Sequence, residues 1–452
     1  MKIRRRWIYL PIEVKDRELI PKIFFAGTAI AQGYGIFLGR NGMNISRKPF
    51  PPGIYFDKCL STHKLEFHRR QVEALGNRLV SLDDEGLVID KERFLSSRIG
   101  AEAIELSSVV FCWGDSQRDA ILERYPSNKV LSVGSPRLDC WRKELDYIYQ
   151  PEADRLRSRY GNFILIPSNF GLYTFDPSSD SSFESLSPHE KSFWQDKDWA
   201  RGAFLEIIPL IGKAFPNHNL IVRPHPGENK KWWEFQREVL KGNGPSNVHI
   251  IADGSVTPWI KAAGVVVHHA CTTAVEAWVG MRKVISYMPG QLSENIGPEK
   301  WGDLPNSLGK KCLTQESLLK TLDYLLSDEM EHARDTEELA CASRYMAIDP
   351  EKSCSAKIVE SLSKLDVQEE SFSLRNFSRS DRLRSSIERT IWGLTDLWNR
   401  NPVTLSYHLQ KNPGISDEEL HEWLDRFTPE WENARQAVKV SQVGRDTFCL
   451  YA

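Results

Sequence analysis

Short apolar runs alternate with helical patterns along most of this 452-residue chain. The run WIYLPIE at Trp7–Glu13, for example, precedes RELIPKIFFAGTAIAQG, which has helical spacing and ends on Gly33. A strand that pairs in parallel with the next strand needs a crossover connection of a dozen or more residues, usually a helix. The alternation therefore predicts an α/β fold with parallel sheets and crossover helices.

The alternation occurs in two sets, which predict two domains. The first set ends with KVLSVGSPRLD at 129–139, and the second begins with NFILIPSNFG at 162–171. The chain is also too long for one ordinary core. We expect a doubly wound, Rossmann-like domain at 1–150, a second at 151–350, and a helical extension at 351–452 that packs back on the first. Two such domains facing each other would place a cleft between the carboxyl ends of their strands, where open α/β sheets bind ligands.

Composition limits the cellular setting and the partners. Apolar residues make up 41% of the chain and charged residues 27%, and the net charge of −2 gives no attraction to nucleic acid. The eight cysteines form no zinc spacing, so we expect reduced thiols, a cytoplasmic protein and no metal. The basic N-terminus, with Lys2 and Arg4–Arg6, is either a solvated start or a peripheral contact with the inner membrane.

A strand-like run at Leu220–Val222 ends on Arg223, Pro224, His225 and Pro226. An arginine offers a planar fork for phosphate oxygens, a histidine can donate a hydrogen bond, and prolines fix the local backbone. This pattern predicts a strand end that faces an anionic ligand. The alternative is a capped strand end with a surface arginine.

A second strand-like run, Gly264–Val267, leads to His268 and His269, and a helix then begins at Thr272 and Thr273. Hydroxyl groups beside the free N–H groups of a helix start form a seat for an anion. Glu276, one turn inside the helix, would reach ribose hydroxyls. The alternative makes Thr272 an ordinary N-cap and His269 a core residue, while the spacing of His268, His269 and Cys271 suits a metal poorly.

A third strand-like run ends on Asp83, Asp84 and Glu85, followed by Gly86. Crowded carboxylates raise one another's pKa, which favours acid–base catalysis. A solvated acidic turn and a magnesium site are the alternatives.

In the second domain, Ser168 and Asn169 follow the first strand and are expected to line the donor pocket.

The acidic pair with its glycine (Asp84, Glu85, Gly86), the His225–Pro226 pair and the Thr272–Thr273 pair together resemble motifs of bacterial sialyltransferases and of β-Kdo transferases. Those are GT-B glycosyltransferases that use CMP-activated ulosonic acids. The wider frame, over about residues 5–330, resembles bacterial surface-carbohydrate biosynthesis proteins through LDDEGLV, FCWG, GSPRLD and RPHP.

The resemblance implies a role for each matching residue. Asp84 or Glu85 would act on the acceptor hydroxyl as a base, or on the sugar as a nucleophile. His225 would bind the CMP phosphate with Arg223, Thr272 and Thr273, and Glu276 would approach the ribose. The expected donor-binding set consists of these four residues together with Pro226, His269, Ser168 and Asn169. No metal or other cofactor is required, and the acceptor would be a glycan or lipid-linked glycan of a capsule or lipopolysaccharide.

This sequence has three acids where the family has two, so the catalytic one stays open, as do inversion or retention and the oligomeric state. Three other functions stay open as well. They are a UDP- or CDP-dependent transferase of the wall-teichoic type, a non-hydrolysing sugar-nucleotide epimerase, and a sugar-nucleotide-binding scaffold without catalysis.

Overall fold

The computed structural model describes residues 2–40, 50–83, 87, 91–170, 188–225, 228–289, 303–327, 334, 336–374, 412–431, 438–444 and 446–452. The chain forms two compact units. Unit 1 comprises Met1–Gly86, Lys91–Cys140 and Ser343–Ala452, and unit 2 comprises Leu87–Asp90 and Trp141–Ala342. Unit 1 is therefore built from both ends of the chain.

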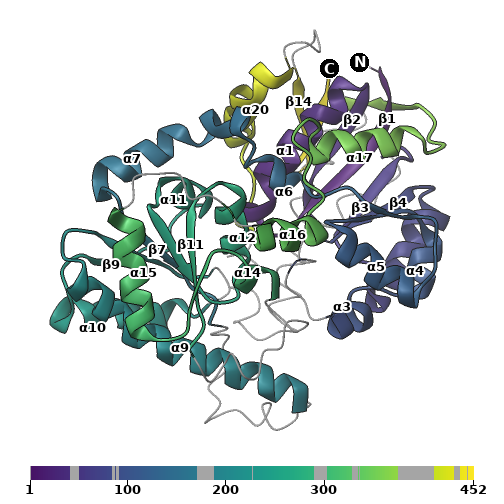
Figure 1. Ribbon diagram of the computed structural model, residues 1–452. Coiled ribbons are helices and arrows are strands. Elements are labelled where there is room, and N and C mark those ends of the chain that lie inside the picture. The colour runs from purple at the N-terminus through teal and green to yellow at the C-terminus, as the bar shows by residue number, and fades with distance from the viewer. Residues whose placement is uncertain are drawn as a thin grey trace. The chain divides into compact units, whose positions relative to one another are not determined.

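Unit 1 has a nine-stranded sheet in the order β14-β15-β2-β1-β3-β4-β5-β6, with β13 paired to β1 off this path (Figure 1). The strands from β2 to β6 run parallel. Their bounds are β1 Lys2–Ile12, β2 Tyr34–Arg40, β3 Ile54–Asp57, β4 Arg78–Leu82, β5 Ser107–Cys112, β6 Val130–Ser132, β13 Glu370–Ser373, β14 Lys439–Gly444 and β15 Thr447–Tyr451.

The helices of unit 1 that precede β6 connect these parallel strands, and α6, α17 and α20 follow β6 in the chain. The longest crossover, α1, follows β1 and leads into β2, and it buries Leu19, Ile23 and Phe25. The bounds are α1 Lys15–Ala31, η1 Thr62–Lys64, α2 Leu65–Arg69, η2 Arg70–Ala74, α3 Lys91–Ser97, α4 Ala101–Leu106, α5 Asp115–Arg124, α6 Pro136–Asp139, α17 Cys354–Ser363 and α20 Asp417–Trp431.

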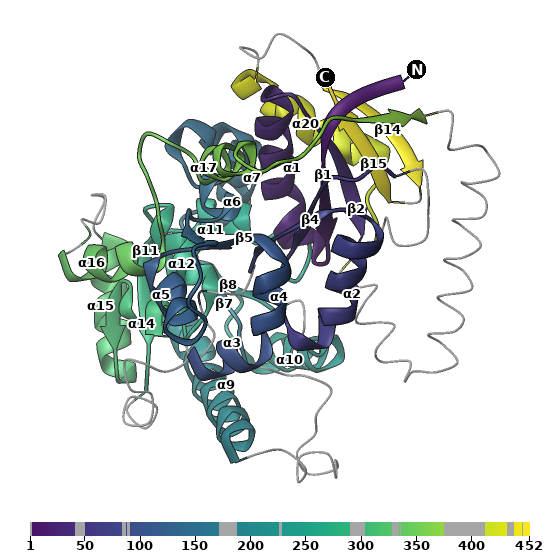
Figure 2. The ribbon, with the colours of Figure 1, turned by 90° about the vertical axis from the view of Figure 1, so that its right-hand side faces the viewer.

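The C-terminal region differs from the helical extension that the sequence predicts, because it also contributes three strands. In the sheet, β15 pairs antiparallel with β2, and β14 pairs antiparallel with β15 on its other side (Figure 2). All five residues of β15 are buried. This short apolar run therefore forms a strand of the sheet and not part of a helix. An antiparallel strand also satisfies the backbone groups that an edge strand would leave open.

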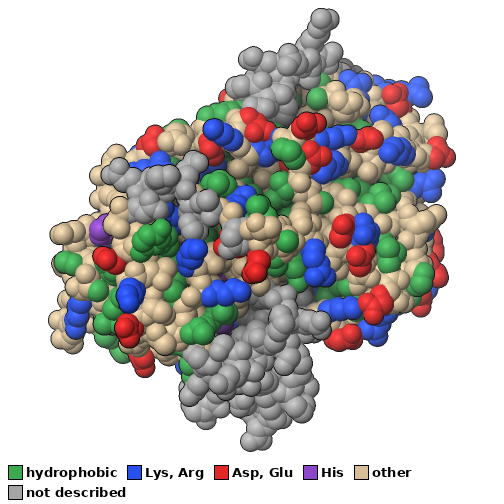
Figure 3. Space-filling view, in the orientation of Figure 1, with side chains coloured by type: hydrophobic (Ala, Val, Ile, Leu, Met, Phe, Trp, Pro, Cys, Tyr) green, Lys and Arg blue, Asp and Glu red, His purple; other side chains and the backbone are tan. Residues whose placement is uncertain are grey.

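Part of the basic N-terminus is engaged by the chain itself. Lys2 to Arg5 lie in β1 opposite β13. Arg5 donates a hydrogen bond to the carbonyl of Ala452 at 2.8 Å, and Arg6 lies over the ring of Tyr34. Figure 3 shows acidic and basic side chains interspersed on the face in view. No helix within the described ranges is both long and apolar enough to cross a lipid bilayer.

Unit 2 has a six-stranded parallel sheet in the order β12-β11-β10-β7-β8-β9 (Figure 1). Its strands are β7 Ile164–Pro167, β8 Leu220–Arg223, β9 Val248–Ile250, β10 Val265–His268, β11 Lys283–Tyr287 and β12 Lys310–Cys312. Its helices are η3 Lys143–Ile148, α7 Gln150–Tyr160, α9 Pro188–Ala214, α10 Lys230–Asn243, α11 Thr257–Ala262, α12 Thr272–Val279, α14 Asp303–Ser307 and α15 Gln315–Ser327, with α16 Thr336–Tyr345 crossing from unit 2 into unit 1.

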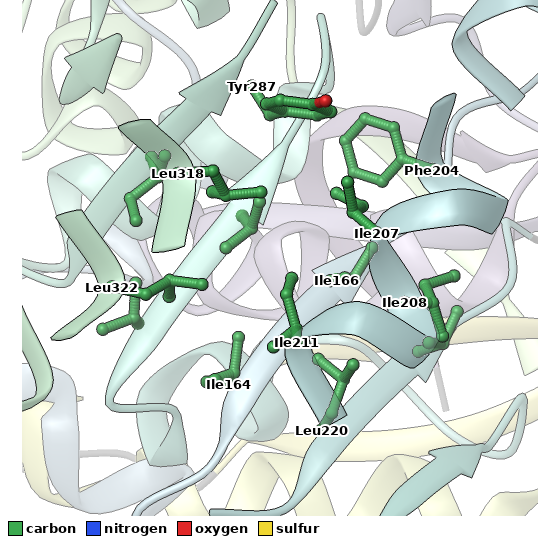
Figure 4. Packing of buried hydrophobic residues seen from close by; sticks show 14 of the residues in the cluster. Ile164, Ile166, Phe204, Ile207, Ile208, Ile211, Leu220, Tyr287, Leu318 and Leu322 are labelled. Carbon is green, nitrogen blue, oxygen red and sulfur yellow. The ribbon is translucent and has the colours of Figure 1, made fainter. Parts of the chain in front are cut away.

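The core of unit 2 lies between this sheet and helices α9 and α15 (Figure 4). Alternate residues of the strands point to one face of the sheet, so β7 supplies Ile164 and Ile166 to the core. Helix α9 covers them with residues at helical spacing, Phe204, Ile207, Ile208 and Ile211. The packing fixes the carboxyl ends of the strands, where the candidate site lies.

Candidate functional site

The order of the strands in unit 2 reverses at β7. This strand comes first in the chain, and later strands lie on both sides of it, with β8 on one side and β10 on the other. In open α/β sheets, ligands bind outside the carboxyl ends of the strands at such a point. The predicted site residues Ser168, Asn169, His225 and His269 all follow the ends of these three strands. The structure therefore gathers them at one edge of the sheet.

Glu228, to which the sequence analysis assigns no role, is the organising residue of this edge. Its carboxylate is buried and accepts hydrogen bonds from the hydroxyl of Ser168 at 2.5 Å and the indole of Trp233 at 2.8 Å. It also accepts from the backbone N–H groups of Phe170 at 2.7 Å and His225 at 3.2 Å. Burial raises the pKa of Glu228, and these hydrogen bonds oppose the rise.

The loops after β7 and β8 are joined through Ser168 and His225. The Ser168 hydroxyl donates to Glu228 and accepts from the His225 N–H at 2.8 Å, so it holds the loops rather than reaching outward. The N–H of Glu228 donates to the carbonyl of His225 at 2.9 Å and closes a turn. His225, the first residue of this turn, is exposed. Pro226 lies outside the described residues.

Arg223 has a different role from the phosphate ligand that the sequence predicts. Its guanidinium is buried and donates to the carbonyls of Ile251 at 3.0 Å, Asp253 at 2.7 Å and Gly254 at 2.6 Å. It also lies over the ring of Trp259, 5.1 Å from the centroid. The fork that suits phosphate oxygens suits these carbonyl oxygens equally, and here it holds the loop after β9.

The two histidines at the end of β10 are buried and neutral. Burial lowers the pKa of both His268 and His269 to about 3. Three ring nitrogens of this pair lack a hydrogen-bond partner among the described residues. They are both nitrogens of His268 and the Nδ1 of His269. The next residue, Ala270, has a φ of +44° and donates its N–H to Asn306 at 2.8 Å. No group of three or more metal-ligating side chains occurs within the described part of the chain.

Helix α12 begins at Thr272, as the sequence predicts. Its N-cap is Cys271, which makes no capping hydrogen bond, so Thr272 is the first helical residue and not the N-cap. Thr272, Thr273 and Glu276 are all partly buried. The first N–H groups of a helix and the positive end of its dipole favour an anion, and two hydroxyls stand beside them here.

A second residue without an assigned role, Lys197, projects from α9 to the same edge. It is 3% exposed, and its ammonium donates to the carbonyl of Asn169 at 2.6 Å. Asn169 in turn donates its side-chain amide to the carbonyl of Ala270 at 2.6 Å and so links the ends of β7 and β10. One lysine in an amphipathic helix gives no signal in the sequence, because only the fold shows which way it points.

In unit 1, the described member of the acidic run is engaged in an ion pair. Asp83 is buried, and its carboxylate accepts from Arg98 at 2.5 and 2.8 Å. Asp84 and Glu85 lie outside the described residues, so their catalytic role stays a prediction.

Unit 1 contains a pocket at its own point of strand reversal, where β1 lies between β2 and β3. Its lining combines apolar side chains, such as Leu10, Phe25 and Phe56, with the charged residues Glu13, Glu18, Lys22, Asp57, Lys58 and Arg137. Burial alone would raise the pKa of Glu18, but the charges of Lys22 and Arg17 hold it at about 2. Asp57 accepts from Lys64 at 2.7 Å and from His68 at 2.9 Å. Such a lining offers both donors and acceptors to hydroxyl groups.

No protein-family model matches the chain, and no curated protein matches its sequence. Several solved structures are similar in fold. HepE of Anabaena in complex with UDP and glucose has 12% identity and a TM-score of 0.43, with 80% of this chain and 100% of that chain covered. The UDP-GlcNAc 2-epimerase of Methanocaldococcus jannaschii with UDP-GlcNAc and UDP has 13% identity and a TM-score of 0.48, with 79% and 99% covered. The wall teichoic acid polymerase TagF has 10% identity and a TM-score of 0.45, with 80% and 89% covered.

Proposed function

We propose that this protein is a glycosyltransferase that takes a sugar from a nucleotide-activated donor. The observation that supports this most directly is the edge of unit 2 where the ends of β7, β8 and β10 meet the start of α12. This is the place at which open α/β sheets bind nucleotides. The partly buried hydroxyls and backbone N–H groups of Thr272 and Thr273 supply the phosphate seat.

The leaving group of such a reaction is a nucleotide phosphate. Hydrogen-bond donors that are fixed before the reaction stabilise the charge that develops on this phosphate, and one such donor is typically worth about 3 kcal/mol of barrier. In this proposal, the start of α12 provides fixed donors, and the exposed imidazole of His225 adds another. Glu228 and Ser168 hold the His225 turn in place. Glu276 reaches the ribose.

Unit 1 supplies the acceptor site in this proposal. Its pocket combines apolar with acidic and basic side chains, which suits the carbon faces and hydroxyl groups of an acceptor such as a glycan or lipid-linked glycan. Asp84 or Glu85 acts on the acceptor hydroxyl. The finer assignment is a CMP-activated ulosonic acid as donor, in the synthesis of a capsule or lipopolysaccharide at the cytoplasmic face of the inner membrane. It rests on the order of the three motifs in the sequence.

A nucleotide screen tests the proposal and its finer part separately. Thermal unfolding is measured with CMP, CDP, UDP and GDP, and the best binder is then offered as its sugar donors. Stabilisation by CMP is expected from the ulosonic-acid assignment, while stabilisation by UDP or CDP alone keeps the transferase and removes that assignment. If no nucleotide binds, the proposed function is wrong.

Amidation of the two candidate acids separates a transferase from a binding scaffold. If the protein is a transferase, the variant that removes the catalytic acid, D84N or E85Q, should have a turnover number lower by about a hundredfold or more. Its nucleotide affinity should stay unchanged. Unchanged turnover in both variants and in their combination would remove these acids from the mechanism.

A further inference from the structure

The start of α1 in unit 1 carries acidic side chains, unlike the start of α12 in unit 2. Helix α1 follows β1, the strand at which the order of the unit 1 sheet reverses. The N-terminal end of such a helix is a place where α/β sheets bind phosphate groups. The first turn of α1 contains Asp16 and Glu18, whereas the first turn of α12 contains no acidic residue. The two helix starts therefore differ in what they offer to an anion.

Glu18 uses the hydrogen-bond donors at the start of α1 for its own carboxylate. The side chain is buried, and its two oxygens accept the N–H groups of Glu13 and Val14, each at 3.0 Å. Lys22 donates to the same carboxylate at 2.8 Å, and the guanidinium of Arg17 lies 3.7 Å from it. Backbone N–H groups and cations are the groups with which proteins hold a phosphate. Here a carboxylate of the chain itself engages them.

Other charged side chains of the unit 1 pocket are engaged within the chain as well. Lys58 forms an ion pair with Glu13, and Asp57 accepts from Lys64 at 2.7 Å. The guanidinium of Arg137 lies over an indole ring. The lining holds three acidic and three basic side chains, so their formal charges cancel. An ionic ligand would compete with these pairs, whereas hydroxyl groups can donate and accept beside them.

We propose that the pocket of unit 1 binds an uncharged sugar unit of the acceptor and that Glu18 excludes phosphate groups from it. The inference rests on the proposed function, in which unit 1 holds the acceptor, and it names the class of acceptor group at this site. The apolar part of the lining, which includes Phe25 and Phe56, suits the carbon faces of a sugar. The acceptor is then recognised in this pocket through its sugar and not through a phosphate.

Hydrogen exchange of the whole protein, measured peptide by peptide, follows the two helix starts separately. The probes are a panel of neutral monosaccharides, their 6-phosphates and inorganic pyrophosphate. At least one neutral sugar should slow exchange at residues 13–22 of the wild type and bind there about tenfold more tightly than its 6-phosphate. Pyrophosphate should leave exchange at residues 13–22 of the wild type unchanged.

Two variants of the same helix turn test the role of Glu18. E18Q keeps the size of the side chain and removes the charge that faces Lys22 and Arg17. We expect pyrophosphate to bind at residues 13–22 of E18Q about tenfold more tightly than in the wild type. D16N is the matched control, because Asp16 is exposed and does not line the pocket. Its affinity for pyrophosphate at residues 13–22 should stay within about threefold of the wild type.

A 6-phosphate that binds the wild type pocket as tightly as its neutral sugar would overturn the inference, and so would a panel in which no sugar slows exchange at residues 13–22. Equal responses of E18Q and D16N to pyrophosphate would remove Glu18 from the selection. If E18Q does not fold, the comparison of sugars in the wild type decides alone. A neutral sugar that binds at residues 13–22, while no nucleotide slows exchange at residues 271–279, supports the pocket and contradicts the proposed function. A nucleotide that binds at residues 271–279, with the 6-phosphate preferred at residues 13–22, contradicts this inference alone.

Discussion

At the scale of single residues, the site depends on a buried carboxylate that orients its neighbours. Glu228 gathers donors from two loops and from Trp233, so its oxygens set the position of the His225 turn. One oxygen serves Ser168, His225 and Trp233, and the other serves Phe170. A glutamine keeps one accepting oxygen and turns an N–H₂ group toward a donor.

We therefore expect E228Q to lose about 1–3 kcal/mol of unfolding free energy and to bind nucleotide more weakly. W233F removes one donor and leaves the carboxylate in place, so it is the matched control and should lose less. Chemical unfolding of the three proteins gives the comparison. A variant as stable as wild type would show that the four hydrogen bonds do not hold the loops.

The pH dependence of this difference has a definite sign. The pKa of Glu228 is raised above its ordinary value of 4.5 by burial. A carboxyl group whose pKa is raised by folding contributes to the free energy of unfolding at a pH below its ordinary pKa. This contribution is lost as the pH rises through the pKa of the folded state. The stability advantage of wild type over E228Q should therefore narrow as the pH rises above 4.5. An advantage that widens with pH would show that the folded pKa is lowered instead.

At the scale of elements, the proposed anion site is the start of helix α12. Thr272 is the first helical residue, and the N-cap is Cys271. The Thr272 hydroxyl is therefore available to a ligand in a way that an N-cap hydroxyl is not.

T272V keeps the shape of the side chain and removes its hydroxyl. We expect the unfolding free energy to change by less than about 0.5 kcal/mol, because no capping bond is lost. Nucleotide affinity should fall several-fold, while nucleoside affinity is kept. A stability loss of about 1 kcal/mol with unchanged affinity would identify Thr272 as a cap instead.

At the scale of the whole molecule, unit 1 depends on the return of the chain after unit 2. Asp139 at the end of α6 accepts the N–H groups of Cys354 at 2.7 Å and Ser355 at 2.8 Å, and the Ser355 hydroxyl at 2.7 Å. These bonds attach α17 to a residue more than 200 positions earlier in the chain. The C-terminal strand β15 then pairs with β2.

D139N should loosen this attachment. We expect a loss of about 1–2 kcal/mol, as for a removed helix cap, and faster hydrogen exchange in α17. Exchange in the strands of unit 2 should stay unchanged and serves as the internal control. Equal acceleration in both units would mean that the aspartate acts on the fold as a whole.

The sequence predicted the alternation of strands and helices, and the ends of β8 and β10 fell where the polar motifs had placed them. It did not predict which polar side chains face a ligand. Arg223, the last residue of β8, and Glu228 lie five positions apart. The loop after β9 decides that the guanidinium is internal, and the loop after β7 decides the same for the carboxylate. The position of Lys197 depends on its contact with Asn169 in another loop, and the strands of the C-terminal region depend on pairing with distant strands. Local periodicity carries no information on such long-range contacts.

The position of a bound nucleotide tests the central claim most directly. A crystal structure of the protein with the nucleotide that stabilises it best should show the phosphate within hydrogen-bond distance of the Thr272 and Thr273 backbone N–H groups at the start of α12. A phosphate bound away from the ends of β7, β8 and β10 would contradict the account.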